Sequence, residues 1–185
     1  LENPMSKPGD GGLFIFLPDK LSEKILSWQK KLNETEKPMP KPHVTLIYPS
    51  FFDRSEWPDN RKSIVECIKK FKPFSLELNK IGIFKDPYFL WVGPGYNEKN
   101  KKLFEMNEIL VSKFEDRIQG LNLVHYTPHV SVGTYISENN LNKAKIELTE
   151  LLKTNVLKFE VKEVFYTVLD TDFRWKIHDL ISLGV

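Results

Sequence analysis

The chain has 185 residues and carries 27 Lys and Arg against 25 Asp and Glu, a net charge of +2. Its length fits one domain or a compact pair of lobes, and its 41% apolar and 12% aromatic content excludes an intrinsically disordered chain. A net charge of +2 is too small to indicate a broad positively charged surface for binding duplex DNA. A nucleotide or an RNA end bound in a local basic pocket is still compatible with it.

The cysteine count and the hydropathy pattern bear on where the protein works. With one Cys no internal disulfide can form, so we expect a reducing compartment, the cytoplasm or also the nucleus. The longest apolar run, Leu13 to Leu17, is far shorter than the roughly 18 residues that span a bilayer. Asp10 and glycines precede this run, so neither a secretory signal nor membrane attachment is expected. Leu1 to Pro4, ahead of Met5, are expected to be a cloning remnant outside the domain.

Hydrophobic periodicity and the positions of Gly and Pro predict the elements of the first half. In chain order they are a buried strand (13–17), a helix capped by Asp19 (19–32), an extended proline-rich segment (37–42), a strand (43–48), a helix (59–71) and two strands (74–84 and 88–92) joined by a turn. Cys67 falls on the apolar stripe of the second helix, which predicts a core residue rather than a nucleophile.

The second half is predicted to repeat this order. Strand 88–92 is followed by a helix (98–115), a strand (128–132), a helix (138–153) and closing strands (157–169 and 175–183). No Gly/Ser-rich linker separates the halves, so we expect one α+β domain over residues 5–185. The duplication predicts two pseudo-symmetric lobes of mainly antiparallel sheet, formed by residues 13–86 and 87–185, with helices outside and a central cleft.

The most informative feature is one short pattern that occurs twice, Pro42-His43-Val44-Thr45 and Pro128-His129-Val130-Ser131. With 4 His and 12 Pro in the chain, two copies arise by chance in fewer than about one in a thousand sequences of this composition. Both copies also occupy matching positions within the duplicated halves. The repeat therefore indicates a function rather than a coincidence.

Strand alternation indicates what the pattern can do. His43 and Thr45 lie on one face of their strand, and His129 and Ser131 on one face of theirs. Two such strands at one cleft supply two groups that titrate near neutrality and two hydroxyl donors. This set suits displacement at phosphorus, in which one imidazole takes a proton and the other gives one, while the hydroxyls hold the nonbridging oxygens.

The paired motifs resemble the H-x-T/S-x motifs of the 2H phosphoesterase superfamily, which includes bacterial 2'-5' RNA ligase-like proteins and plant and fungal cyclic phosphodiesterases. The resemblance spans nearly the whole chain. It implies a bilobal α+β fold and metal-free, cofactor-free chemistry on 2',3'-cyclic or 2'-5' phosphodiester bonds. It also implies His43 and His129 as catalytic residues, with Thr45 and Ser131 holding the phosphate; Ser131 stands where Thr is commonest.

Two other interpretations of the histidines are disfavoured. Each could be an ordinary strand histidine, although the repeat argues against this. A zinc site from His125 and His129 is disfavoured because Pro128 intrudes and no His/Cys cluster of recognised spacing is present. We therefore expect no metal, and His125 is predicted to lie in a loop or at a strand edge.

Several aromatic residues are candidates for the cleft. Tyr135 falls on the face of His129 by alternation, whereas Tyr48 falls on the face opposite His43 and is expected to be structural. Phe16, Trp91 and Trp175 are candidates for stacking on a nucleobase, although core packing is the favoured role for each.

We therefore hypothesise a monomeric, metal-independent phosphodiesterase that hydrolyses 2',3'-cyclic phosphates of RNA ends or of small cyclic nucleotides. The alternatives are cleavage or ligation of a 2'-5' linkage, and a non-catalytic module that binds nucleotides or RNA ends. We expect the side-chain nitrogens of His43 and His129 to lie within roughly 5–8 Å, the span of one phosphate with a hydrogen bond on each side. Which imidazole is the base is not readable from the sequence.

Overall fold

The computed structural model describes residues 6–35, 39–49, 54–118 and 125–184. Residues 1–4 and the start of the proline-rich segment, 37–38, lie outside the described residues. Within the described ranges, no helix is both long and apolar enough to cross a membrane.

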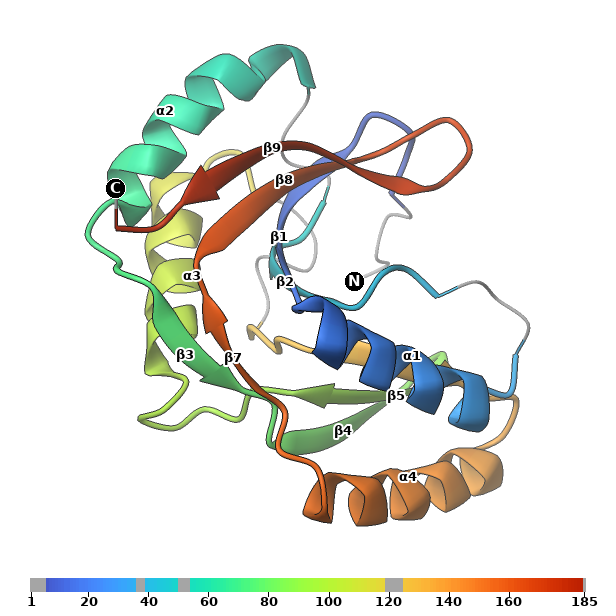
Figure 1. The fold of residues 1–185 in the computed structure, drawn as a ribbon. Coiled ribbons are helices and arrows are strands. Elements are labelled where there is room, and N and C mark those ends of the chain that lie inside the picture. Colours follow the sequence, from blue (N-terminus) through green and yellow to red (C-terminus); the bar gives the residue numbers. More distant parts are fainter. Residues whose placement is uncertain (1–5, 36–38, 50–53, 119–124, 185) are drawn as a thin grey trace.

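The helices and strands alternate along the chain (Figure 1). The helices are α1 (Asp19–Leu32), α2 (Trp57–Ile68), α3 (Lys101–Lys113) and α4 (Glu138–Lys153), with a short 3-10 helix η1 (Arg54–Glu56) before α2. The strands are β1 (Gly11–Phe16), β2 (His43–Ile47), β3 (Phe74–Glu77), β4 (Lys80–Lys85), β5 (Tyr88–Gly93), β6 (Val130–Thr134), β7 (Lys158–Val161), β8 (Glu163–Leu169) and β9 (Trp175–Ser182).

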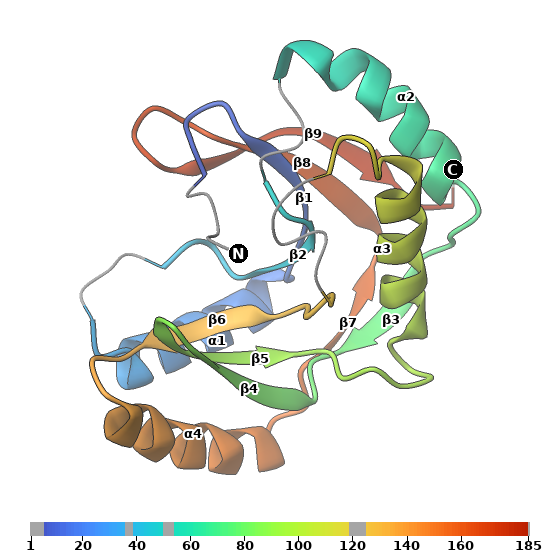
Figure 2. The same ribbon diagram turned by 180° about the vertical axis from the view of Figure 1, so that it is seen from behind.

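The strands form three antiparallel sheets, and this confirms the predicted α+β class. A four-stranded sheet has the order β2-β1-β8-β9, a three-stranded sheet has the order β4-β5-β6, and β3 pairs with β7. Helices α1 and α4 pack against the three-stranded sheet, while α3 packs against β2. Trp57 of α2 stacks on Tyr166 of β8 with ring centroids 3.7 Å apart. Figures 1 and 2 show these two helix pairs at opposite ends of the molecule.

The two larger sheets have similar strand pairings, but each sheet contains strands from both halves of the chain. β1 pairs with β2 and β8, and β5 pairs with β6 and β4. β8 of the second half thus completes the sheet begun by the first half, and β4 of the first half completes the other sheet. The prediction of one lobe from 13–86 and one from 87–185 is therefore wrong. Each half alone would leave β1 or β5 with an open edge, and the exchanged strand covers that edge.

Two predicted strands are each divided in the structure. Residues 74–84 form β3 and β4, and residues 157–169 form β7 and β8. Leu78 N–H donates to the Leu157 carbonyl at 2.8 Å where the β3–β7 ribbon ends, and the Asn79 side chain then accepts from Gly95 N–H at 3.0 Å. The apolar pattern continues through both breaks, so periodicity does not reveal that the chain passes from one sheet to another.

Two further local predictions are corrected. Pro18 is the N-cap of α1, and Asp19 is the first residue of the helix. At this position the positive end of the helix dipole stabilises the Asp19 carboxylate. Cys67 is half-buried on α2 and packs against the edge of the core rather than within it.

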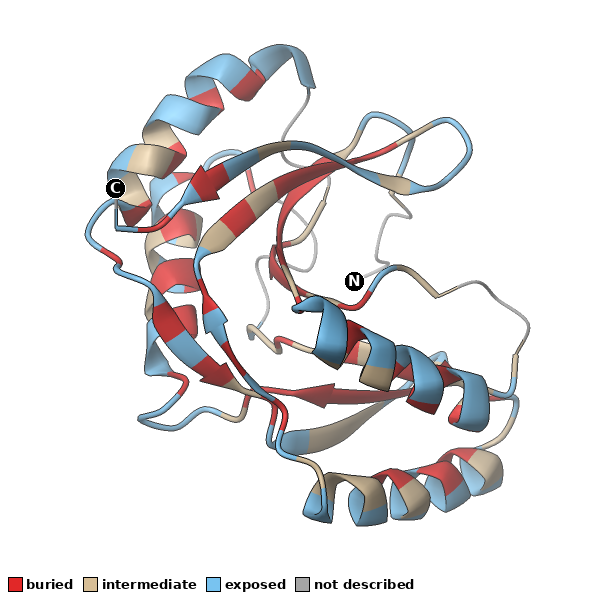
Figure 3. Cartoon of the chain, in the orientation of Figure 1, coloured by how far each residue is buried: buried red, intermediate tan, exposed pale blue. Residues whose placement is uncertain are grey.

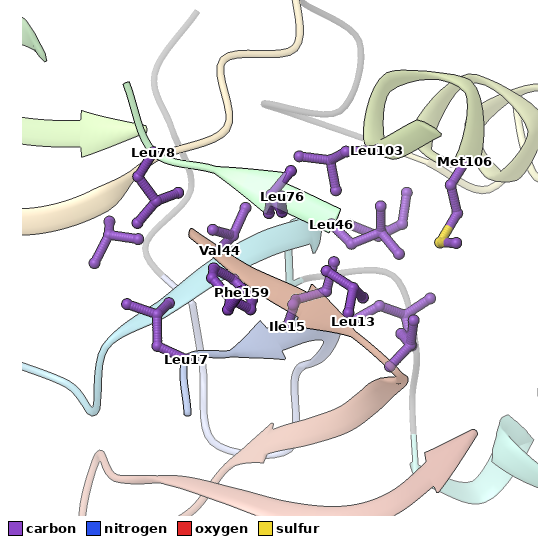
Figure 4. Close-up of a cluster of buried hydrophobic side chains, with 14 of the residues drawn as sticks. Leu13, Ile15, Leu17, Val44, Leu46, Leu76, Leu78, Leu103, Met106 and Phe159 are labelled. Carbon is purple, nitrogen blue, oxygen red and sulfur yellow. The ribbon is translucent and has the colours of Figure 1, made fainter. Parts of the chain in front are cut away.

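The core lies where the sheets and helices meet (Figure 3). Val44 and Leu46, the back face of the first motif strand, are both 0% exposed. Figure 4 shows the side chains that converge on them from β1, β3, β7 and α3. Because a β-strand alternates its faces, burying this back face anchors the strand that carries His43.

Candidate active site

The two motif histidines occupy equivalent places in the two larger sheets. His43 is the first residue of β2, and His129 immediately precedes β6. β2 and β6 lie beside each other where the two sheets meet, as Figure 2 shows. The pKa of His43 is lowered in part by the charge of His129, an effect that requires a nearby group. The structure therefore places the two motif strands side by side, and the predicted 5–8 Å separation of the imidazole nitrogens stays a prediction.

Both imidazoles are oriented by the same backbone hydrogen bond. His43 Nδ1 donates to the Lys41 carbonyl at 2.7 Å, and His129 Nδ1 donates to the Thr127 carbonyl at 2.9 Å. In each case the acceptor is two residues before the histidine. A carbonyl oxygen can only accept, so Nδ1 carries the hydrogen and the neutral ring keeps its lone pair on Nε2. Each ring thus has Nε2 as the nitrogen that can take or give a proton.

Each motif strand carries a β-bulge at the residue after its hydroxyl. The register of β2 against β1 skips Leu46, and the register of β6 against β5 skips Val132. A bulge inserts one residue, so side chains beyond it point to the face opposite from that given by simple alternation.

The contacts of two tyrosines beyond the bulges test the sequence predictions made for them. Tyr135 is only 7% exposed and donates its hydroxyl to the Leu32 carbonyl of α1 at 2.7 Å. Tyr135 is therefore a core residue rather than a cleft residue. Tyr48, expected to be structural, donates to the Thr127 carbonyl at 3.4 Å, a bond that ties the two motif segments together and agrees with that expectation.

Helix side chains pair with backbone carbonyls at the bulges. Asn107 of α3 donates its side-chain amide to the Leu46 carbonyl at 2.8 Å, and Gln29 of α1 donates to the Ser131 carbonyl at 2.8 Å. A bulge interrupts the ladder, and a buried carbonyl without a partner would be costly. Sequence reasoning missed both residues, although an amide on the otherwise apolar stripe of a helix is a readable signal.

Two tyrosines join the motif segments to each other. The Tyr126 hydroxyl donates to the Thr45 carbonyl at 2.8 Å, and the Tyr48 hydroxyl reaches the carbonyl that also holds His129. Burial raises the pKa of Tyr48 to about 12 and raises the pKa of Tyr126 well above 10, so both remain neutral donors. Sequence reasoning missed Tyr126, because nothing in the sequence distinguishes it from a loop tyrosine.

Aromatic rings surround both imidazoles. Phe14, which is 2% exposed, stacks on His43 with centroids 4.2 Å apart and ring planes 6° apart. His129 is bordered by Phe84 at 5.2 Å, Phe89 at 6.0 Å and Trp91 at 5.9 Å between centroids. Phe14 escaped sequence reasoning because the apolar run around it has no distinguishing pattern.

Trp91 is held below His129 and does not offer an open face to a base. Its side chain is 4% exposed and lies across Gly82 of β4, where an added Cβ would come within 1.9 Å of the ring. Glycine at position 82 is what permits this close approach. Trp91 therefore has the favoured core role, and its candidacy as a stacking platform is not supported.

Phe16 and Trp175 lie at the first motif. Together with Lys41 and His43 they line a pocket of about 370 Å³. The Phe16 ring lies 5.8 Å from that of His43, and Lys41 Nζ lies 5.4 Å above the Phe16 ring. Both aromatics thus border the imidazole in a space open to a ligand.

The environment lowers the pKa of both histidines. Burial lowers the pKa of His43 from 6.5 to about 4; its bond to the Lys41 carbonyl opposes this change, and the charge of His129 adds to it. Burial also lowers the pKa of His129, against the effect of the Thr127 carbonyl. The arrangement therefore favours a neutral His43 with a free lone pair on Nε2.

His125 does not join this site as a metal ligand. It lies exposed in the loop before β6, as the sequence predicted. In the described part of the chain, no group of three or more His, Cys, Asp or Glu side chains is arranged to hold a metal ion.

Comparisons with solved structures show the same fold in other proteins. The fold is similar to that of E. coli LigT complexed with 3'-AMP, with a TM-score of 0.67 and 15% identity over 97% of this chain and 100% of that chain. The structure of TT0787 from Thermus thermophilus matches with a TM-score of 0.67 and 18% identity, over 95% of this chain and 98% of that chain. The structure of Kluyveromyces marxianus Usb1 matches with a TM-score of 0.54 and 18% identity, over 96% of this chain and 99% of that chain.

A search among curated proteins finds no significant sequence match. The model of the 2'-5' RNA ligase superfamily matches residues 17–172, a span that contains both histidine motifs and the strands that carry them. The resemblance drawn from the motifs is confirmed. The chain belongs to the 2'-5' RNA ligase superfamily of phosphoesterases and RNA ligase-like enzymes.

Proposed function

We propose that this chain is a phosphodiesterase that opens 2',3'-cyclic phosphates of RNA ends or nucleotides, with His43 and His129 as its acid–base pair. The observation that carries the proposal is the matched orientation of the two rings. Each donates Nδ1–H to a carbonyl two residues earlier in the chain, which leaves Nε2 for proton transfer. A displacement at phosphorus needs one such group at the attacking oxygen and one at the leaving oxygen.

The two imidazoles divide the reaction into balanced proton transfers. Water attacks phosphorus as its proton passes to Nε2 of one histidine, and a new P–O bond forms. The bond from phosphorus to one ribose oxygen breaks, and that oxygen takes the proton from Nε2 of the other histidine. The product is a phosphomonoester beside a free ribose hydroxyl. Thr45 and Ser131 hold the nonbridging oxygens, and solvent exchange then restores the starting protonation of both rings.

The environment favours His43 as the base and His129 as the acid. Burial and the charge of His129 together bring the pKa of His43 to about 4, so His43 is neutral over the physiological range. Burial also lowers the pKa of His129, but no neighbouring charge among the described residues adds to that effect as it does at His43; we therefore assign the first proton that the pair binds to His129. A phosphate anion between the rings would stabilise that proton further.

The pH dependence of activity follows from these directions. In the free enzyme kcat/KM rises as His43 loses its proton near pH 4 and falls as His129 loses its own below about pH 6.5, the usual pKa of histidine. The profile of kcat/KM should therefore be bell-shaped with its optimum on the acidic side of about pH 6.5. The profile of kcat should lie at higher pH, because the bound anion raises both pKa values.

Turnover tests the proposal directly. Adenosine 2',3'-cyclic monophosphate and a 2'-5'-linked diadenylate are incubated separately with the protein, and the products are followed by phosphorus NMR. Conversion of the cyclic phosphate to a monoester supports the proposed function. Conversion of the 2'-5' dinucleotide alone would replace it with the 2'-5' activity that the superfamily's name suggests. Binding of nucleotide with no conversion of either would favour a non-catalytic binding module.

A further inference from the structure

The β8–β9 hairpin places an unusual residue at its tip. Phe173 has φ 57°, a left-handed conformation that is a genuine outlier for a bulky residue, and its side chain is 69% exposed. The turn holds it there, since the Asp170 carboxylate accepts from the N–H groups of Asp172 and Arg174 at 2.9 and 2.8 Å. Backbone strain that neighbouring bonds maintain is concentrated at functional sites.

The hairpin adjoins the pocket at His43. Trp175, Lys176 and Ile177 of β9 line that pocket together with Lys41 and His43, and Ile177 is 49% exposed. Trp175 is held against Phe14 with centroids 5.3 Å apart, and Phe14 in turn supports the imidazole of His43. The hairpin tip lies on the side of the molecule away from α2 and α3 (Figures 1 and 2).

The pocket has the size and charge for one nucleotide unit. Its volume of about 370 Å³ is at the small end of the roughly 300–1,000 Å³ usual for ligand sites. Lys176 is paired with Asp170 at 2.8 Å, whereas Lys41 has no carboxylate partner among the described residues. Lys41 therefore provides a positive charge for a phosphate beside His43, and any second nucleotide has to lie outside the pocket.

We propose that Phe173, Trp175 and Lys41 extend the site at His43 into a surface that binds the unpaired nucleotides of an RNA end. This inference rests on the proposed function of the histidine pair and narrows its substrate. One nucleotide fills the pocket beside Trp175, and the next stacks on the exposed ring of Phe173, because any aromatic face accepts a nucleobase. The preferred substrate is a single-stranded end of two or more nucleotides rather than a free cyclic mononucleotide.

The inference is tested by binding, which does not depend on turnover. Fluorescence titration compares a tetranucleotide ending in a 3'-phosphate with a nucleoside 3'-monophosphate. Each base stacked on an aromatic residue is worth about 5- to 150-fold in affinity, so the tetranucleotide should bind at least about fivefold more tightly. Trp175→Ala should weaken the binding of both ligands, because both place a nucleotide beside Trp175, and Trp175→Phe should restore part of this affinity.

Phe173→Gly separates binding from folding. Glycine adopts positive φ without strain, so this variant should melt about 1–4 °C higher than the wild type and yet bind the tetranucleotide about 5-fold or more weakly. The matched control is Ile146→Ala on α4, an apolar residue of nearly equal exposure at 67%, which should leave binding unchanged. Lys41→Ala should lower the slope of log Kd against log salt by about 0.7, and Lys143→Ala on α4 should not.

The outcomes distinguish the two proposals. Equal affinity for the two ligands, or unchanged binding in both Phe173→Gly and Trp175→Ala, overturns the inference. Length-dependent binding that these variants weaken supports it even if no cyclic phosphate is opened, in which case only the proposed activity fails.

Discussion

The half-buried imidazole of His43 should make the stability of the fold depend on pH. Its pKa falls from 6.5 to about 4 on folding, chiefly because burial disfavours the charged ring. Between these values the unfolded chain binds more protons than the folded chain, so stability rises with pH through this window. The contribution is fully present above pH 6.5 and is lost as the pH falls toward 4. One pKa unit corresponds to about 1.4 kcal/mol, so the loss is about 3 kcal/mol.

Urea denaturation at pH 7, 6, 5 and 4 measures this effect. The wild type should lose about 3 kcal/mol more free energy of unfolding between pH 7 and pH 4 than His43→Asn, which cannot titrate. His129 contributes in the same direction to both proteins and therefore cancels in the comparison. His125→Asn, at an exposed loop position, is the matched control and should follow the wild type. If His43→Asn and the wild type lose stability in parallel, His43 is not held neutral by the fold.

Three further predictions concern the surroundings of the pair. Tyr126→Phe leaves the buried Thr45 carbonyl without its donor and should lower the free energy of unfolding by about 1–3 kcal/mol. The control Tyr96→Phe, at a side chain that is 78% exposed, should change the free energy of unfolding by less than about 0.5 kcal/mol. Equal effects of the two variants would contradict the role given to Tyr126. Thr45→Ala and Ser131→Ala should each lower kcat/KM about 10- to 150-fold, which corresponds to the loss of one hydrogen bond to a charged group. Thr45→Ser keeps a hydroxyl and should retain most of the activity. Wild-type rates in both alanine variants would show that the hydroxyls do not hold the phosphate. Because the proposed mechanism assigns both proton transfers to the imidazoles, activity should survive EDTA. A loss of activity that zinc or manganese restores would contradict this division of roles.

The order of elements and the pair of histidines could be predicted because they depend on local pattern. Periodicity indicates all four helices, and α4 matches its predicted bounds, 138–153, in full. The exchange of β4 and β8 between the sheets could not be predicted, since the strand pattern of each satisfies either sheet equally well. The identity of the sheet partner is set by tertiary packing and not by alternation.

The details of the site depended on two bulges that single-sequence alternation does not reveal. The extra residues Leu46 and Val132 look like ordinary apolar strand positions, yet the bulge at Val132 accounts for the buried position of Tyr135. The proposed assignment of base and acid likewise rests on the surroundings of the two rings, which differ between motifs that are nearly identical in sequence. Four residues of local pattern predict the chemistry, and the packing around them supports the role proposed for each imidazole.

The most direct test of the two-histidine account is the rate at which single variants open a 2',3'-cyclic phosphate. His43→Ala and His129→Ala should each lower kcat by about 10²- to 10⁴-fold, with circular dichroism spectra like that of the wild type. The double variant should lose less than the product of the two single losses, because the residues act as a unit. Wild-type rates in either single variant would contradict the proposed mechanism.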